Sequence, residues 1–290
     1  MLRRFVALWG LAVLVSLSAC KTNYVDPDQS AAEQNETDIK TYVTQNNLNA
    51  QRTTSGLYYV ITTANPNGKK PGIGDELEFN YKLFTLGNVK VDSSKKDTAV
   101  YLPFGLGAML PGLEEGMSLM REGEKATLLM PAYLAFGSRA QPLIPANSAV
   151  RFDVQLLRAR TEDQQIQDYL DRQKLTVSEA TTNGVRVVKT TTVPTGAALA
   201  TGQTVKVNYA GRLLRGKTDF DKGTIDVTLG QRQVVAGFEE GISKLRVGEK
   251  ALIIFPSAQG YGTQGRSSNG VYVIPPYSPL AFEIEVVSVR

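Results

Sequence analysis

The feature that most constrains this sequence is an internal repeat. Residues 110–131 and 235–256 are identical at 11 of 22 aligned positions, and both contain E-E-G followed by R-x-G-E-K-A. Such self-similarity predicts two copies of one structural unit. With a length of 290 residues, the repeat predicts two domains, at residues 37–160 and 161–290.

Each copy of the repeat is expected to form a short helix and then a strand. Large apolar residues recur at spacings i, i+4 and i+7, which places them on one stripe of a helix suited to lie across a sheet. The stripe residues are Leu113, Met117 and Met120 in the first copy, and Phe238, Ile242 and Leu245 in the second. Short apolar runs at residues 127–130 and 252–255 then predict a buried strand in each copy.

The flanking residues predict the fold class. Apolar and polar residues alternate at 77–82, 150–156, 205–209 and 280–286, as in strands that bury one face. Each copy also begins with a helical pattern, one after Thr37-Asp38 and one after Thr161 with Asp163 as a candidate cap. We therefore expect an α+β fold in which an antiparallel sheet wraps around one short helix, preceded by an extra N-terminal helix.

Composition excludes several function classes. The chain contains no His, which rules out Ser-His-Asp and Cys-His triads, His-ligated zinc and imidazole acid–base catalysis. The formal net charge is +4, and without Arg3 and Arg4 it becomes +4 − 2 = +2. This charge is too small for a nucleic-acid footprint, and we expect no nucleic-acid partner, no cofactor and no metal site.

The N-terminus has the pattern of an export signal. Basic residues precede an apolar stretch from Phe5 to Ala19 that is too short to span a bilayer. The sequence Leu17-Ser18-Ala19-Cys20 resembles the lipobox of bacterial lipoproteins. That resemblance implies cleavage after residue 19, a lipid on Cys20 and an envelope location facing the periplasm or the exterior. The alternative is a free cysteine in a plain secretory signal.

Residues 20–36 are predicted to be a flexible tether. They are polar, with almost no large apolar side chains, and such a composition cannot bury a core. A flexible chain of this length has a root-mean-square reach of roughly 20–25 Å. Because Cys20 is the only cysteine, neither domain depends on an internal disulfide.

The second half resembles a known family. The motifs are V-K-V-N-Y-A-G at 205–211, Phe220-Asp221, L-G at 229–230, V-V-A-G-F-E-E-G at 234–241, Tyr261-Gly262 and I-P-P at 274–276. In this order they resemble the FKBP-type peptidyl-prolyl isomerases over about residues 200–290. Residues 72–158 are similar but less faithful.

The resemblance implies a pocket between helix and sheet that holds a proline ring. By position it would be lined by Tyr209, Phe220, Asp221, Ile225, Val234, Val235, Phe238, Tyr261, Ile274 and Phe282. Phe238 would be the floor, where the family most often has Trp. The N–H of Val235 and the hydroxyl of Tyr261 would hydrogen-bond the carbonyls beside the proline.

Each of these residues also has a purely structural interpretation. The aliphatic residues and phenylalanines are typical of a core, the two tyrosines of a sheet edge, and Asp221 of a turn. The pairs Glu114-Glu115 and Glu239-Glu240 are better explained as favourable first-turn helix charges than as acid–base groups.

The first domain departs from the family pattern. Its aligned residues are Tyr81, Val91, Asp92, Val100, Met109, Leu110, Leu113, Phe136, Ile144 and Phe152. Leu113 replaces the floor aromatic, Val91 replaces a wall Phe, and Phe136 lacks the hydroxyl of Tyr261. We expect this domain to isomerise weakly or only to bind.

Two functions follow as hypotheses. The first is isomerisation of X–Pro bonds in proline-containing, unfolded or partly folded exported polypeptides, mainly through the second domain. The second is a non-catalytic binding or chaperone lipoprotein. The loop at 262–273, about three residues longer than usual for the family, is expected to influence substrate preference, with Tyr272 either shielding the site or reaching into it.

Overall fold

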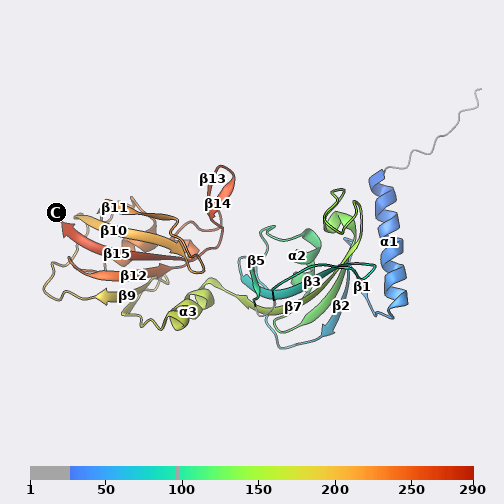
Figure 1. Cartoon of the computed structure of the whole chain (residues 1–290). Helices are drawn as coiled ribbons and strands as arrows, with labels where there is room; N and C mark the ends of the chain where they lie inside the picture. Colours follow the sequence, from blue (N-terminus) through green and yellow to red (C-terminus); the bar gives the residue numbers. More distant parts are fainter. Residues whose placement is uncertain (1–26, 96–97) are drawn as a thin grey trace, which may run out of the picture.

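The computed structural model describes residues 27–95 and 98–290, which form two domains, each built on one antiparallel sheet (Figure 1). Domain 1 ends with strand β7 (Val150–Arg160), and domain 2 begins directly afterwards with helix α3 (Glu162–Gln173). The predicted α+β class matches this arrangement.

Domain 1 contains a sheet with strand order β1-β2-β6-β7-β3-β4, and β5 pairs with β3 beside β4. Its elements are α1 (Pro27–Gln45), β1 (Gln51–Arg52), β2 (Tyr58–Thr63), β3 (Glu76–Thr85), β4 (Lys90–Ser93), β5 (Val100–Pro103), α2 (Pro111–Leu119), β6 (Lys125–Met130), the 3-10 turn η1 (Ala132–Leu134) and β7.

Domain 2 repeats this order with β11-β10-β15-β12-β9-β8 and adds a separate β13-β14 hairpin. Its elements are α3, β8 (Glu179–Ala180), β9 (Arg186–Thr191), β10 (Thr204–Leu213), β11 (Asp221–Thr228), α4 (Ala236–Ile242), β12 (Lys250–Phe255), the 3-10 turn η2 (Ser257–Gln259), β13 (Arg266–Ser268), β14 (Val271–Ile274) and β15 (Leu280–Val289).

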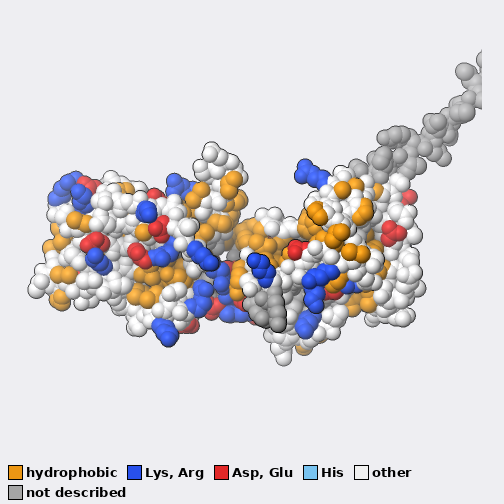
Figure 2. Space-filling view, viewed as in Figure 1, with side chains coloured by type: hydrophobic (Ala, Val, Ile, Leu, Met, Phe, Trp, Pro, Cys, Tyr) orange, Lys and Arg blue, Asp and Glu red, His pale blue; other side chains and the backbone are white. Residues whose placement is uncertain are grey.

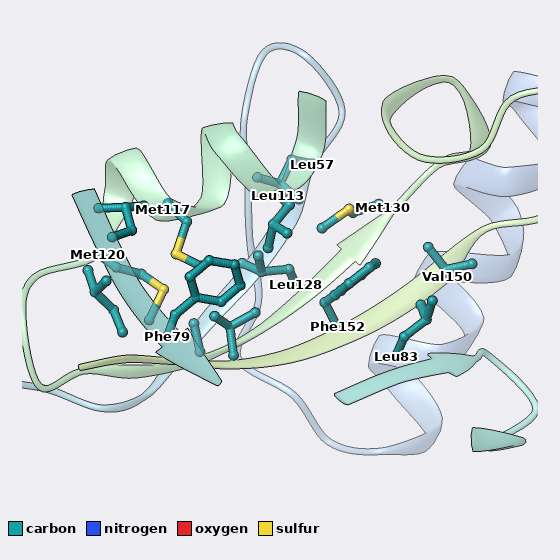
Figure 3. Close-up of a cluster of buried hydrophobic side chains, with 14 of the residues drawn as sticks. Leu57, Phe79, Leu83, Leu113, Met117, Met120, Leu128, Met130, Val150 and Phe152 are labelled. Carbon is teal, nitrogen blue, oxygen red and sulfur yellow. The ribbon is translucent and has the colours of Figure 1, made fainter. Parts of the chain in front are cut away.

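The helix of each repeat lies flush on the sheet because glycines face the central strand. A methyl group at Gly116 of α2 would lie 2.4 Å from a methyl of Leu128, and one at Gly241 of α4 would lie 2.3 Å from a methyl of Ile253. The predicted stripe residues are buried beside them, and Met117 and Met120 are fully inaccessible. Figure 3 shows the side chains of Met117 on α2 and of Met120 directly after it pointing toward the sheet.

The R-x-G-E-K-A segment is a turn held by its glutamate. In domain 2 the buried Glu249 accepts hydrogen bonds from the backbone N–H groups of Arg246 (2.9 Å) and Val193 (3.3 Å) and from Lys189 Nζ (2.9 Å). In domain 1, Glu124 accepts from the N–H groups of Arg121 (2.8 Å) and Asn65 (3.0 Å). The repeat therefore conserves the residue that joins helix to strand in both copies.

The two N-terminal helices cover the outer faces of the sheets. In α1, Ile39 and Tyr42 pack on Leu129 and Ala149, and in α3 the side chains of Ile166, Tyr169 and Leu170 pack on Ile254 and its neighbours. Thr161 caps α3 in a capping box with Gln164, so the cap is Thr161 and not Asp163.

The prediction of a flexible tether up to residue 36 is wrong for residues 27–36. These residues form the first half of α1, and Thr37 lies inside the helix, donating to the carbonyl of Glu33 (3.0 Å). The side chain of Asn35 is buried, accepting from the Ala132 N–H (2.6 Å) and donating to the Asn147 carbonyl (2.8 Å). This part of α1 is therefore held to the domain by polar contacts of Asn35, and not by the stripe of apolar residues on which the sequence prediction of a helix depended. The predicted signal, Cys20 and the first part of the tether lie outside the described residues.

Candidate active site

Four aromatic rings of domain 2 converge between α4 and the sheet. Phe282 on β15 is at the centre, with its ring centroid 5.0 Å from that of Phe238 at 80° and 5.6 Å from that of Phe220 at 84°. Tyr209 on β10 meets Phe238 edge-on at 5.8 Å. Such edge-to-face pairs are favourable beyond the burial of their area, so the cluster has a defined geometry.

Strand pairing brings these rings together. In the β10–β15 ladder, Gly211 lies opposite Phe282 and Tyr209 lies opposite Ile284. A methyl group on Gly211 would lie 2.4 Å from Phe282 Cε1 and 2.8 Å from Phe220 Cζ. The absence of a side chain at Gly211 therefore lets both rings approach the strand.

Apart from Asp221 and Ile225, the predicted residues form one contiguous set with a buried centre and an accessible edge. Ile274, Phe238 and Phe282 are at most 5% exposed, and partly exposed residues pack around them. These outer residues are Tyr209, Phe220, Val234, Val235 and Tyr261. Asp221 and Ile225 lie on exposed positions of β11; Ile225 is 36% exposed and is not among the residues packed on this core.

The described surface of domain 2 has hollows on both faces of its sheet. On the described surface, a hollow of about 540 Å³ bordered by Val234 and Glu239 lies beside the cluster. Another of about 490 Å³, bordered by Tyr169, Leu252 and the strand segment 208–210, lies on the face of the sheet that α3 covers. The cluster itself is a packed aromatic surface, with ring centroids 5.0 to 6.4 Å apart and partly exposed residues at its edge.

The polar groups at the edge suit hydrogen bonding and not proton transfer. Burial, followed by the negative charge of Asp221, raises the pKa of the Tyr209 hydroxyl, which stays protonated at neutral pH. Among the described residues, neither the N–H of Val235 nor the hydroxyl of Tyr261 has a hydrogen-bond partner. Val235 is the N-cap of α4, where backbone N–H groups lack intrahelical acceptors.

The first glutamate of each E-E-G motif anchors the loop before the helix. Glu239 accepts from the N–H groups of Gly230 (2.5 Å) and Arg232 (3.1 Å). Glu114 accepts in the same way from Gly105 (2.7 Å) and Leu106 (3.0 Å). These carboxylates are occupied by backbone donors, so their role is to hold the loop in place.

Domain 1 assembles the equivalent residues with different chemistry. The Tyr81 and Phe152 ring centroids lie 5.8 Å apart, and the Tyr81 hydroxyl donates to Asp92 (2.6 Å). Burial and this hydrogen bond raise the pKa of Tyr81 to about 12. Leu113 and Ile144 are buried beside them. The remaining predicted residues, Val91, Val100, Met109, Leu110 and Phe136, pack on the same core and are partly exposed.

One difference between the domains escaped the sequence interpretation. Leu83 in domain 1 occupies the strand position of Gly211 in domain 2, opposite Phe152. It is 4% exposed, and Figure 3 shows it beside Phe152 and Val150. Leu83 in domain 1 thus corresponds to Gly211 in domain 2, and Val91 corresponds to Phe220. A residue-by-residue alignment of β3 with β10 would have shown that a large side chain in domain 1 corresponds to a glycine in domain 2.

A helix lying across an antiparallel sheet, built twice and with an aromatic cluster beneath the helix of domain 2, defines a tandem α+β protein. A model of the FKBP-type peptidyl-prolyl cis-trans isomerase family matches residues 67–157 and 196–287. The two matches together cover more than half of the chain. The chain therefore belongs to this family, which confirms the resemblance inferred from the motifs.

The chain is similar to several named proteins. It is 30% identical over 224 residues to peptidyl-prolyl cis-trans isomerase FKBP9 of Rattus norvegicus, covering 74% of this chain and 35% of the relative. It is 28% identical over 227 residues to FKBP10 of Homo sapiens, covering 75% and 35%. The chain thus spans about a third of the length of these relatives. The crystal structure of the three FKBP domains of wheat FKBP73 aligns at 21% identity with a TM-score of 0.40, covering 82% of this chain and 96% of that one.

Residues 27–95 and 98–290 contain no cluster of three or more Cys, Asp or Glu side chains arranged to hold a metal ion. None of the helices in these ranges is long and apolar enough to cross a membrane.

Proposed function

We propose that this protein accelerates the cis–trans rotation of X–Pro bonds in exported polypeptides, mainly through domain 2. The observation that carries the proposal is the convergence of Tyr209, Phe220, Phe238 and Phe282 with centroid distances of 5.0 to 6.4 Å. Membership in the isomerase family supports it. The substrates are proline-containing segments of unfolded or partly folded chains.

The reaction requires no covalent step. Rotation about an X–Pro bond is slowed by amide resonance, with a barrier of about 18–20 kcal/mol, and takes tens to hundreds of seconds. Shortening ~100 s to ~10 ms is a factor of about 10⁴, or ~5.4 kcal/mol. The twisted amide has less charge separation than the planar one, so an apolar aromatic surface that excludes water disfavours the planar ground state relative to the transition state.

Hydrogen bonds supply a smaller part of the effect. One bond contributes about 1 kcal/mol net, so the Val235 N–H and the Tyr261 hydroxyl orient the substrate carbonyls without accounting for the whole acceleration. Shape selection of the twisted proline, water exclusion and preorganised donors act together. Domain 1 has Leu113 in place of the floor aromatic and Phe136 in place of Tyr261, so we assign it weak isomerisation or binding only.

The test compares matched floor substitutions in the full chain. Phe238→Ala is expected to lower kcat/KM at least about tenfold in a proline-limited peptide assay, the scale that loss of a buried aromatic contact implies. Leu113→Ala at the same place in domain 1 is the control and is expected to change it less than about twofold. Equal losses in the two variants would refute the assignment to domain 2. Tyr261→Phe is expected to give a smaller loss, of about fivefold.

The alternative function remains a binding module. It is favoured specifically in domain 1, because Leu83 fills space beside Phe152 and the hydroxyl donor is missing. If the wild-type chain fails to accelerate isomerisation but binds an unfolded proline-containing polypeptide, the non-catalytic function is the correct one.

We also propose that Cys20 carries a lipid that holds the domains at an envelope membrane, facing the periplasm or the exterior. The basic start, the apolar run and Leu17-Ser18-Ala19-Cys20 support this proposal. Metabolic labelling with a radioactive fatty acid should mark the wild-type chain and not Cys20→Ser. Equal labelling of both would refute it.

A further inference from the structure

Domain 1 contacts domain 2 at the two loops that lead into the aromatic cluster. Figure 1 shows the β13–β14 end of domain 2 next to β5 of domain 1, and Figure 2 shows Lys and Arg side chains gathered at the waist between the domains. A cavity of about 400 Å³ lies at this junction, with walls from both domains that include Tyr101, Arg215 and Tyr277. The domains therefore meet at a few defined contacts around a hollow.

The first contact is the ring of Tyr277 against Gly74 of domain 1. A methyl group on Gly74 would lie 2.4 Å from Tyr277 Cδ1. Tyr277 follows Ile274 of the cluster by three residues, and its N–H donates to the carbonyl of Gly262 (3.0 Å), directly after Tyr261. One residue thus joins domain 1 to both segments that form this side of the site.

The backbone of Tyr277 supports a special role for its ring. Its φ is +54°, in the left-handed region, which is a genuine outlier for a bulky residue. The corresponding residue of domain 1 is Asn147, with φ +56° and an equivalent N–H bond to Gly137 (3.0 Å). Asn adopts this backbone conformation readily. Domain 2 instead has Tyr277 there, a residue less suited to the conformation, whose ring reaches domain 1.

The second contact grips the loop before Phe220. Arg215 Nε donates to Glu76 of β3 (2.9 Å), and its guanidinium lies 3.7 Å from the ring centroid of Tyr101 on β5. Phe220 follows five residues later and is fixed through its N–H to the Gly211 carbonyl (2.9 Å). Both loops that carry cluster residues are therefore attached to domain 1.

Arg160 at the end of β7 holds Glu76, the residue of domain 1 to which Arg215 binds. Arg160, with a side chain 4% exposed, pairs with Glu76 (2.8 Å) and Glu78 (3.2 Å) of domain 1 and with Asp168 of α3 (2.9 Å). At the positions of these two glutamates domain 2 has Thr204 and Lys206. Domain 2 therefore lacks this acidic pair, which in domain 1 pairs with Arg160 at the junction.

We propose that Tyr277 and Arg215 are positioning residues through which domain 1 holds the substrate-binding loops of domain 2 in their productive geometry. The inference rests on the proposed function of domain 2. Domain 1 thereby contributes to the reaction without touching the substrate.

The test uses the full chain with Tyr277→Asn and Arg215→Gln. Each is expected to lower kcat/KM of the proline-limited peptide by about three- to tenfold, the range typical of long-range coupling, mainly through KM. Amide exchange at residues 262–279 should accelerate in Tyr277→Asn, and at residues 214–220 in Arg215→Gln. A merely structural role predicts the opposite for Tyr277→Asn, because Asn suits φ +54° better.

Two controls match these variants. Lys217→Gln removes an exposed charge from the same loop as Arg215, and Tyr133→Asn removes an exposed tyrosine of domain 1; both should leave kcat/KM and exchange unchanged. Unchanged values in the two junction variants, or a change in only one of the two readouts, overturn the inference. An inactive wild-type chain would instead refute the proposed function, and peptide Kd would then replace kcat/KM alongside exchange.

Discussion

Gly211→Ala is the smallest change that tests the geometry of the aromatic cluster. The added methyl group would lie 2.4 Å from Phe282 Cε1 and 2.8 Å from Phe220 Cζ, whereas carbon atoms in contact are separated by about 3.5–4.0 Å. Phe282 would have to move by about 1 Å. It is stacked on Phe255 at 5.7 Å and 9° and meets Phe238 at 5.0 Å, so no empty space accepts the shift.

The expected cost follows from two opposing effects. Overpacking a well-packed core costs about 1–3 kcal/mol, while replacing Gly by Ala stabilises by about 0.4–1 kcal/mol through the unfolded chain. We expect a net destabilisation of domain 2 by about 1–2 kcal/mol, which is a factor of about 5–30 in the folded-to-unfolded ratio.

Residue-resolved hydrogen exchange in the full chain provides the assay, because it reports the stability of each domain separately. Amides of β10 and β15 should exchange about 5–30 times faster in Gly211→Ala, while those of β3 and β7 should not change. Adding Phe220→Val, which supplies the residue that domain 1 has at this place, should recover part of the loss because it frees volume. Wild-type exchange rates in Gly211→Ala would refute the proposed packing.

Two further predictions concern stability. Burial alone would raise the pKa of Glu249, but its hydrogen bonds to Lys189 and to backbone N–H groups outweigh burial and lower it. The stabilisation that ionised Glu249 gives to the fold is therefore complete above the pKa that Glu249 has in the unfolded chain. It is lost as the pH falls through the lower pKa that Glu249 has in the folded protein. Glu249→Gln should therefore cost about 2 kcal/mol at pH 7 and progressively less below pH 5 in urea denaturation, and a gap independent of pH would contradict this. Asn35→Ala should accelerate exchange throughout α1, at a cost of about 1–3 kcal/mol, because it leaves the Ala132 N–H and the Asn147 carbonyl unpaired; unchanged protection of α1 would show that these bonds do not anchor it.

The sequence predicted most of the fold because local pattern and global packing agree in the repeat. The stripe of Met117 and Met120, the alternating strands and the buried strand after each repeat helix each appear as predicted. The start of α1 was mispredicted because residues 27–36 have no apolar periodicity. Their helix depends instead on long-range polar contacts such as that of Asn35 with Ala132, which no local pattern shows.

The candidate site was predicted as a set of residues, but not its packing. The motifs place Tyr209, Phe238 and Phe282 in one cluster, and the structure brings them within 6.4 Å of one another. The close packing of these rings depends on Gly211, because any side chain at this position would collide with Phe282 and Phe220. The junction contacts join residues of different domains, so neither periodicity nor a single-domain family pattern contains them.

One pair of differences between the two copies is compensating, so the fold accommodates two different site surfaces at this place. Gly211 with Phe220 in one domain corresponds to Leu83 with Val91 in the other, so the side-chain volume removed at one position is added at its neighbour. Introducing Gly alone at Leu83 would leave a cavity, and Phe alone at Val91 would meet the Leu83 side chain. At these two positions, neither single substitution alone keeps the core of domain 1 packed. The shared glycines and glutamates of the helix–turn–strand unit, such as Gly241 and Glu249, lie outside these pairs, which is why both copies retain one architecture around different sites.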